Sequence, residues 1–232
     1  MNAAVVTVGD ELLVGDTDNT NATWLCDRLD EFGVVVRRVT VVPDEVGEIA
    51  RVVNEYHAEY DAVVVTGGLG PTHDDVTMEG VAAAFGRELV ENPDAAAWLA
   101  ERGYSADDLA AETTHLPAGC RPLSNEVGVA PGAVVESAYV LPGVPHEMKA
   151  MFESVAGEFE GTPTHTVTVD VDEPESALLE RFTALQEEFD VSVGSYPGES
   201  VRVKITATRA AEAERAAEWV RERSDLVGSE ER

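Results

Sequence analysis

The sequence predicts an α/β domain with a mostly parallel sheet, followed by a small α+β domain. Residues 3–8, 34–42 and 61–66 are valine-rich apolar runs, and each precedes a polar loop and an amphipathic segment. This βαβαβα order implies a parallel sheet with right-handed crossovers. A linker-like stretch, Glu160–Pro163, then separates residues 1–160 from a second unit at residues 164–224.

Amphipathic helices are predicted after each of the three strands. Asn19, Thr20 or Asn21 can cap the first helix, and Asp44 can cap the second. The third covers residues 78–85.

The rest of the first unit is predicted to mix short elements with one long loop. Two short helices are expected at residues 93–102 and 105–112, and a hairpin or strand pair at 133–136 and 138–141. Residues 119–132 are expected to be a loop, and loops of ~12 residues are often functional. Pro145, at a first helical position, begins a helix that extends to Phe159.

The second unit follows a βαββα pattern. The expected strands are residues 164–171, 191–196 and 201–207, and the expected helices are 174–189 and 210–223. Helix faces rich in Leu and Phe should pack on one side of an antiparallel sheet, and the tail after Ser224 should be frayed.

Composition restricts the class of partner. The chain of 232 residues has 45 acids against 16 bases, a net charge of −29 spread along the sequence. We interpret this acidic surface as halophilic adaptation, because salt near 1 M screens charges within roughly 3 Å. DNA and RNA are disfavoured as partners, because phosphate binding needs a basic stripe.

The cysteines and the N-terminus favour a cytoplasmic protein. Cys26 and Cys120 lack the spacing of a zinc site and fit reduced thiols. The sequence shows neither a signal peptide nor an apolar run of membrane length, so no membrane association is expected.

The stretch from Thr66 to Thr77 reads TGGLGPTHDDVT and connects a strand to a helix. Glycines let the backbone approach a ligand, and the start of a helix favours a phosphate or carboxylate. The alternative is a tight βα connection in which Asp75 or Thr77 only caps the helix.

Loops at the carboxyl ends of parallel strands meet at one sheet edge, so Asp10, Asp44, Asp74 and Asp75 can come together. Carboxylates next to bound phosphate suit a divalent cation. His73 and His146 are candidate bases, although a surface histidine in a loop is the simpler interpretation of His73.

Four stretches together resemble the CinA (competence/damage-inducible protein A) N-terminal family, whose domain has the MogA/MoaB-type molybdopterin-binding fold. They are GDELL…G…NTN from Gly9, TGGLGPT…DDVT from Thr66, N…G…APG from Asn125, and LPGVP…EM from Leu141. The C-terminal βαββα unit is similar to that family's middle domain.

The resemblance implies a three-layer α-β-α fold and metal-dependent cleavage of a nucleotide pyrophosphate such as ADP-ribose. Aspartates important in relatives match Asp44 and Asp75. Many molybdopterin enzymes have arginine where this chain has Asp74, which favours a second metal-ligating carboxylate.

The expected site therefore has three groups of residues. The catalytic residues are Asp75, Asp74 and Asp44, and the metal ligands are Asp74, Asp75 and Asp10. The ligand-binding residues are Gly67, Gly68, Leu69, Gly70, Pro71, Thr72, Thr77, Asp10, Glu11, Asn19, Asn125, Gly143 and Pro145. The expected cofactor is Mg²⁺ or another divalent cation (Co²⁺, Mn²⁺), with K⁺ as a further candidate.

Two alternatives stay open. The chain can be a molybdopterin- or nucleotide-binding protein of the molybdenum cofactor biosynthesis type without hydrolase activity, or an oligomeric regulatory protein with a vestigial pocket. We expect a small-molecule nucleotide or pterin ligand and a homo-oligomer.

Overall fold

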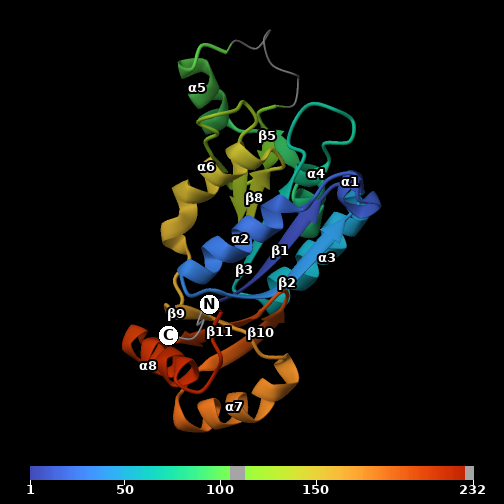
Figure 1. The fold of residues 1–232 in the computed structure, drawn as a ribbon. Coiled ribbons are helices and arrows are strands. Elements are labelled where there is room, and N and C mark those ends of the chain that lie inside the picture. Colours follow the sequence, from blue (N-terminus) through green and yellow to red (C-terminus); the bar gives the residue numbers. More distant parts are fainter. Residues whose placement is uncertain (105–112, 228–232) are drawn as a thin grey trace. The chain divides into compact units, whose positions relative to one another are not determined.

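The computed structural model describes residues 1–104 and 113–227. The chain divides into two compact units, Met1–Gly161 and Thr162–Arg232, and each is described by itself (Figure 1). The helix expected at residues 105–112 lies outside the described residues. None of the described helices is both long enough and apolar enough to cross a membrane.

The first unit is built on a six-stranded sheet in the order β2-β1-β3-β8-β7-β6. Strands β1 (Asn2–Val8), β2 (Val35–Val42), β3 (Ala62–Gly67) and β8 (Ala138–Pro142) are parallel. Strands β7 (Gly132–Val135) and β6 (Arg121–Leu123) are antiparallel to their neighbours. The α/β class and the mostly parallel sheet are confirmed.

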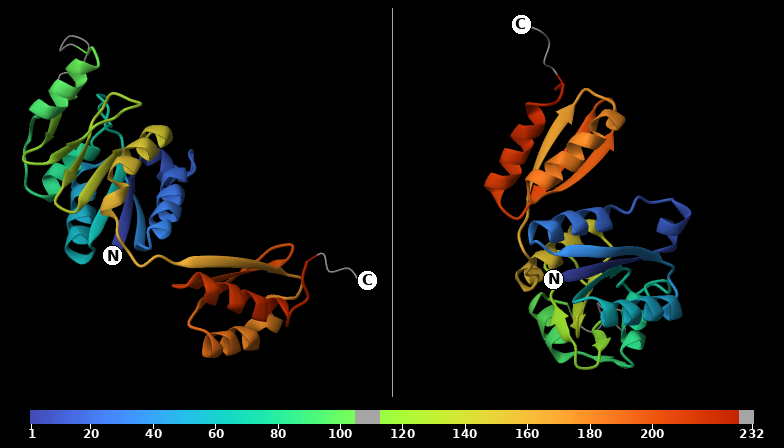
Figure 2. Two further views of the ribbon diagram at one scale, coloured as in Figure 1. Left: turned by 90° about the vertical axis from the view of Figure 1, so that its left-hand side faces the viewer. Right: turned by 90° about the horizontal axis from the view of Figure 1, so that it is seen from below.

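Helices cover both faces of this sheet and make three layers (Figure 2, left). Helices α2 (Thr20–Glu31) and α6 (Pro145–Val155) pack on one face through Leu25, Leu29 and Phe152. Helices α3 (Val46–Glu59) and α4 (Thr77–Ala84) pack on the other through Ile49 and Val81. β1 and β3 are buried on both faces, which explains their continuous apolar sequences.

Short elements account for most differences from the predictions. Helix α1 (Asp10–Val14) and strand β6 lie where loops were expected. Strands β4 (Leu89–Glu91) and β5 (His115–Pro117) form a separate two-stranded sheet beside α5 (Pro93–Glu101). α1, β4, β5 and β6 have only three to five residues and no clear hydrophobic period, so the sequence pattern did not reveal them. The helix expected to reach Phe159 ends at Val155, and the 3₁₀ turn η1 (Ala156–Glu158) follows.

The second unit has the predicted βαββα order. Strands β9 (His165–Val171), β10 (Ser192–Pro197) and β11 (Val201–Ala207) form an antiparallel sheet in the order β10-β11-β9. Helices α7 (Glu175–Glu188) and α8 (Ala210–Arg221) cover one face of it, around Leu178, Leu185 and Val203. The prediction of a frayed tail is wrong for residues 225–227, because Leu226 pairs with Val171 and the Asp225 N–H donates to Glu173.

Candidate functional site

Polar loops meet at the carboxyl edge of the parallel strands in the first unit. β1 leads into α1, β2 into α3, β3 into the glycine turn (defined here as residues 66–72), and β8 into α6. Ligands bind at this edge in open α/β sheets. The predicted site residues lie here or in the adjoining loop at residues 124–132.

The three glycines of the glycine turn lie too close to their neighbours to carry side chains. A Cβ on Gly67 would lie 2.4 Å from Thr77 Oγ1 and 2.7 Å from Val8 Cβ. A Cβ on Gly68 would lie 2.0 Å from Asp75 Oδ1, and one on Gly70 would lie 2.8 Å from Asp75 Oδ2. The glycines are therefore needed so that residues 75–77 can fold back over the turn.

Asp75 faces this turn. Its Oδ2 accepts hydrogen bonds from the Thr72 N–H at 3.0 Å and from the Thr72 hydroxyl. The alternative in which Asp75 or Thr77 caps α4 is wrong, because Val76 occupies the N-cap position and no side chain bonds there. The fully buried Thr77 hydroxyl has no partner among the described residues.

Asp74 points away from the fold beside the same threonine. Its side chain is 63% exposed, and hydrogen bonding to Thr72 lowers its pKa below the usual value. The neighbouring His73 side chain is 98% exposed, with Nδ1 3.8 Å from Asp74 Oδ1. His146 is also exposed, and among the described residues no hydrogen bond orients either histidine as a base.

Asp10 and Asp44 bond to each other's backbone. The Asp10 N–H donates to Asp44 Oδ2 at 2.9 Å, and the Asp44 N–H donates to Asp10 Oδ1 at 3.4 Å. Asp44 therefore binds the start of α1, and the prediction that it caps α3 is wrong, because that N-cap is Glu45.

The pKa of the Asp44 carboxyl at this edge is shifted from its usual value. Burial raises its pKa above the usual value, and the hydrogen bond from Asp10 partly opposes this. The charges of three nearby acids, Asp10, Glu11 and Asp74, raise it further. Loops after three different strands thus bring these carboxylates within electrostatic range. Within the described residues, no Lys or Arg forms an ion pair with any of the four.

An asparagine–threonine network joins three strands on the other side of the turn. Asn19 caps α2 and donates to Thr7 of β1 at 2.9 Å. Asn21 donates to Thr66 of β3 and, at 2.7 Å, to the carbonyl of Gly143 after β8. The buried Asn21 Oδ1 has no partner among the described residues.

Asn125 organises the loop before β7. It is 1% exposed, and its amide donates to the Ala130 carbonyl at 3.0 Å and to Glu147 at 2.7 Å. Its Oδ1 accepts from the Gly128 N–H at 2.9 Å. These contacts use both amide hydrogens within the protein, so neither is free to donate to a ligand.

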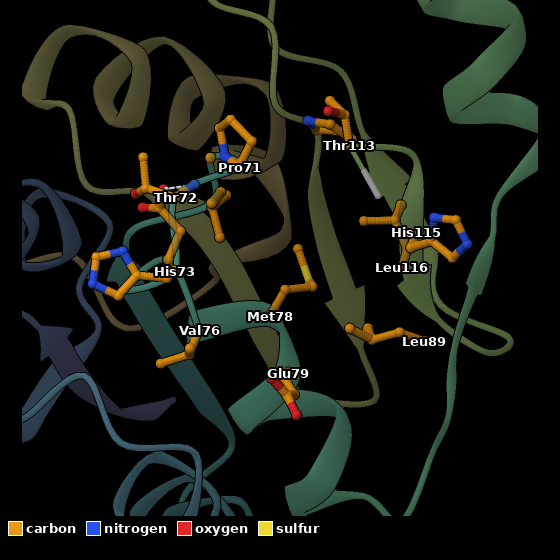
Figure 3. Close-up of a pocket in the computed structure, with 14 residues that line it drawn as sticks. Pro71, Thr72, His73, Val76, Met78, Glu79, Leu89, Thr113, His115 and Leu116 are labelled. Carbon is orange, nitrogen blue, oxygen red and sulfur yellow. Dashed lines mark hydrogen bonds between the residues drawn. The ribbon is translucent and has the colours of Figure 1, made fainter. Parts of the chain in front are cut away.

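Two cavities open beside the glycine turn. The larger, about 430 Å³, adjoins residues 69–76 and extends between α4 and the β4–β5 sheet (Figure 3). The smaller, about 100 Å³, lies between Thr66, the start of α2 and the start of α6. Glu11, Asn19, Gly143 and Pro145 line the smaller cavity; Leu69, Gly70, Pro71, Thr72 and Asp75 line the larger one.

Some lining residues were not anticipated. Thr7, Asn21 and Thr66 stand at strand or helix ends, and polar residues that interrupt an apolar strand could have revealed the two threonines. Met78, Leu89 and Leu116 look like ordinary core residues in the sequence, which gives no signal that they face a cavity.

The donor chemistry of the acidic edge fits a hard divalent cation. The residues within 1–104 and 113–227 contain no group of three acids, cysteines or histidines already arranged around one point. Mg²⁺ usually takes only one or two protein carboxylates together with substrate phosphates, so Asp44 with Asp10 or Asp74 would suffice. The Asp75 carboxylate accepts hydrogen bonds from Thr72 and is not one of these proposed metal ligands in this conformation.

Fold and site together define a small-molecule-binding α/β domain with a site at its sheet edge. The family described as "Probable molybdopterin binding domain" matches residues 4–160, and "FAD synthase, middle domain" matches residues 163–227. The chain belongs to the molybdopterin-binding-domain family.

A solved structure confirms the resemblance to CinA, and two relatives are similar to most of this chain. A protein of Archaeoglobus fulgidus is 38% identical over 85% of this chain and 86% of its own. One from Aeropyrum pernix is 48% identical over 65% of this chain and 59% of its own. The crystal structure of "the protein CinA with unknown function" from Thermoplasma acidophilum is 39% identical, with a TM-score of 0.63, over 69% of this chain and 99% of its own.

Proposed function

We propose that this protein is a metal-dependent nucleotide pyrophosphatase that acts on ADP-ribose or a similar nucleotide diphosphate. One observation carries the proposal: Asp10, Glu11, Asp44 and Asp74 share one edge with no Lys or Arg paired to them in the described structure. Neighbouring carboxylates without a cationic partner suit a divalent cation, and a phosphate-bearing substrate brings the remaining ligands for it. A metal also lets this acidic edge accept an anionic substrate.

Each part of the edge then has a role. Asp44 and Asp10, fixed by their mutual hydrogen bonds, would hold the cation with Asp74. When bound, such a cation neutralises the diphosphate and lowers the pKa of a bound water. Backbone N–H groups at the glycine turn and at the start of α4 would orient the phosphates.

The second candidate is a nucleotide- or pterin-binding protein without hydrolase activity. The position of Asp75 favours this second candidate. This predicted catalytic carboxylate accepts hydrogen bonds from Thr72 and packs against Gly68 and Gly70. A hydrolase that uses Asp75 has to release it when the substrate binds.

The test is incubation with ADP-ribose and Mg²⁺, Co²⁺ or Mn²⁺ at high salt, followed by chromatography for AMP and ribose 5-phosphate. Asp44→Asn should slow product formation at least tenfold. Asp30→Asn, an exposed change on α2, is the matched control and should have no effect. If wild-type protein binds ADP-ribose but never forms AMP with any of these metals, the non-hydrolytic candidate is correct.

A further inference from the structure

The outer edge of β10 has no partner strand in the second unit. β10 is the last strand in the order β10-β11-β9, and none of the described residues pairs with its outer side. The opposite edge of the same sheet is covered by residues 225–227, which exchange backbone hydrogen bonds with Asp170 and Asp172 of the β9 side. An unpartnered edge strand presents N–H and C=O groups that another strand can bond.

β10 lacks the features that protect other outer strands of this chain. Outer strand β2 of the first sheet carries Arg37 and Arg38, and outer strand β6 has only three residues, one of which is Pro122. Charges, prolines and short length all oppose pairing at an edge. Residues 191–197 read VSVGSYP and contain no charge, although 26% of the chain is charged. The sequence of β10 therefore permits a pairing that β2 and β6 oppose.

The side of α7 nearest this edge carries no charge at its exposed positions. α7 packs over β10 and α8 over β9 and β11, on one face of the sheet (Figure 2, left). Glu175 marks the β10 side of α7, because it accepts a hydrogen bond from Ser195. Glu188 marks the α8 side, because it accepts from Trp219. With about 3.6 residues per turn, three exposed and uncharged residues fall on the β10 side: Leu179, Thr183 and Gln186.

Two large apolar side chains flank the edge on opposite faces of the sheet. Leu179 is 59% exposed and lies one helical turn after Glu175, beside β10. Tyr196 is 57% exposed and lies on the uncovered face, because it pairs with Arg202 while the alternate residues of β11 are buried against the helices. The β10 edge surface (β10 with Leu179, Thr183 and Gln186) thus combines free strand bonding with apolar contact.

Charge indicates that a second copy of the chain occupies this surface. With a net charge of −29, two copies repel each other over most of their surfaces and can approach where charge is absent. Two identical strands paired antiparallel are self-complementary, as a two-fold interface requires. A stable interface buries about 1,200–2,000 Å², more than two short strands supply, so the adjoining side of α7 has to take part.

We infer that β10 pairs antiparallel with β10 of a second copy. The two three-stranded sheets then form one six-stranded sheet, and the two α7 helices pack side by side on one face through Leu179. This interface lies wholly in the second unit and does not depend on the chemistry proposed for the first.

Sedimentation equilibrium of the whole chain at 0.1 M and 1 M KCl tests the association. Wild type should form a dimer, and the dissociation constant should fall at least tenfold at the higher salt, because screening removes the repulsion between the acidic surfaces. A chain that stays monomeric at both salt concentrations overturns the inference and leaves the edge to a segment of another protein. A dimer that weakens as salt is added is held by ion pairs, which also overturns it.

A charge placed on the β10 edge surface tests its location. Leu179→Glu should weaken the dimer at least tenfold, because both copies bring the new charge to the interface. Ala177→Glu is the matched control: it adds the same charge to an exposed position of α7, on the side turned away from β10, and should leave the dimer unchanged. Circular dichroism checks that both variants are folded. Equal weakening by the two substitutions overturns the location.

Hydrogen exchange tests the strand itself. In wild type, residues 191–197 should exchange at least tenfold more slowly at concentrations where the dimer forms than where it dissociates. Residues 201–207 of β11, paired on both sides within the unit, should exchange at the same rate at both concentrations. The protection of residues 191–197 should disappear in Leu179→Glu. A wild-type dimer whose residues 191–197 gain no protection forms through another surface and overturns the inference.

Discussion

Asp10 and Asp44 fix each other at the carboxyl edge of the sheet, because the backbone N–H of each donates to the carboxylate of the other. The pair joins the end of β1 to the end of β2 at 2.9 and 3.4 Å. Both carboxylates keep free lone pairs after these bonds. The arrangement therefore holds two acids close together, and burial raises the pKa of Asp44 above its usual value.

Asp44→Asn should stabilise the protein slightly at neutral pH in the absence of metal. The pKa of Asp44 is raised in the fold, so the folded state holds this proton more tightly than the unfolded state does. Stability contributed by this group is therefore present below the ordinary aspartate pKa of 3.8 and is lost as the pH rises through the raised value. An asparagine still accepts from Asp10 and carries no charge. We expect a gain of about 0.5 kcal/mol or less, because partly exposed charges interact weakly.

Thermal melts of wild type and Asp44→Asn across pH 3–8 measure this difference. It should shrink toward the acidic end, where wild-type Asp44 is protonated in both states. Adding Mg²⁺ should raise the melting temperature of wild type more than that of the variant. A variant less stable than wild type at pH 7 without metal would contradict the prediction.

Gly68→Ala should act through Asp75. The new Cβ would lie 2.0 Å from Asp75 Oδ1, so the carboxylate has to leave Thr72 and lose two hydrogen bonds. We expect a loss of about 1.5–3 kcal/mol, the range for hydrogen bonds to a charged group. In an Asp75→Ala background the same change should cost less, because the carboxylate is gone and only the 3.1 Å approach of the new Cβ to the Cα of residue 75 remains.

A double-mutant cycle on the free energy of unfolding in urea checks this coupling. Gly15→Ala is a useful control, because its Cβ meets nothing within 4 Å while its positive φ alone brings strain. Additive costs for Gly68→Ala and Asp75→Ala would show that the carboxylate does not rest on the turn.

Asn125→Asp should be strongly destabilising in a pH-dependent way. The substitution places a carboxylate oxygen 2.7 Å from Glu147 and 3.0 Å from the Ala130 carbonyl, where Asn125 has donors. We expect a loss of about 2–4 kcal/mol at pH 7, from an unpaired buried acceptor and like-charge repulsion. A proton shared between the two carboxylates should restore part of it near pH 5.

The helix cap Asn92 provides the comparison for this substitution. Its Oδ1 accepts from the Asp94 and Ala95 N–H groups, so Asn92→Asp keeps the interaction and should change stability little. Urea unfolding at pH 5 and pH 7 distinguishes the variants. If Asn125→Asp lowers the free energy of unfolding by the same amount at both pH values, repulsion from Glu147 is ruled out.

The sequence predicted the layers of the fold because long apolar periods determine them. Val63, Val64 and Val65 are buried on both faces of the sheet, and Ile49, Val52 and Val53 on α3 follow helical spacing. Burial of this kind is the dominant favourable term in folding, so its pattern is visible in the residues. The short elements β4 and α1 depend on tertiary contacts and leave no such pattern.

The candidate site was predictable in location more than in detail. Strand order placed Asp10, Asp44 and Asp74 at one edge, and their mutual effect on the Asp44 pKa shows that they lie near one another. The sequence alone could not predict the direction in which each side chain points. The sequence predicted Asp75 as a metal ligand. In the structure its carboxylate accepts two hydrogen bonds from Thr72, three residues earlier, and so lies against the glycine turn.

The last prediction concerns the acid excess. Thirteen arginine–carboxylate ion pairs appear among the described residues, yet the chain retains a net charge of −29, so self-repulsion opposes the compact state. Raising KCl from 0.1 M to 1 M shortens the Debye length from about 10 Å to about 3 Å and should raise the melting temperature by several degrees. Most of the gain should come below 1 M, because little repulsion is left to screen above it. NaCl should match KCl if screening is the cause, and a larger effect of KCl would indicate a specific K⁺ site. Melting temperatures that do not change up to 1 M of either salt would contradict halophilic adaptation.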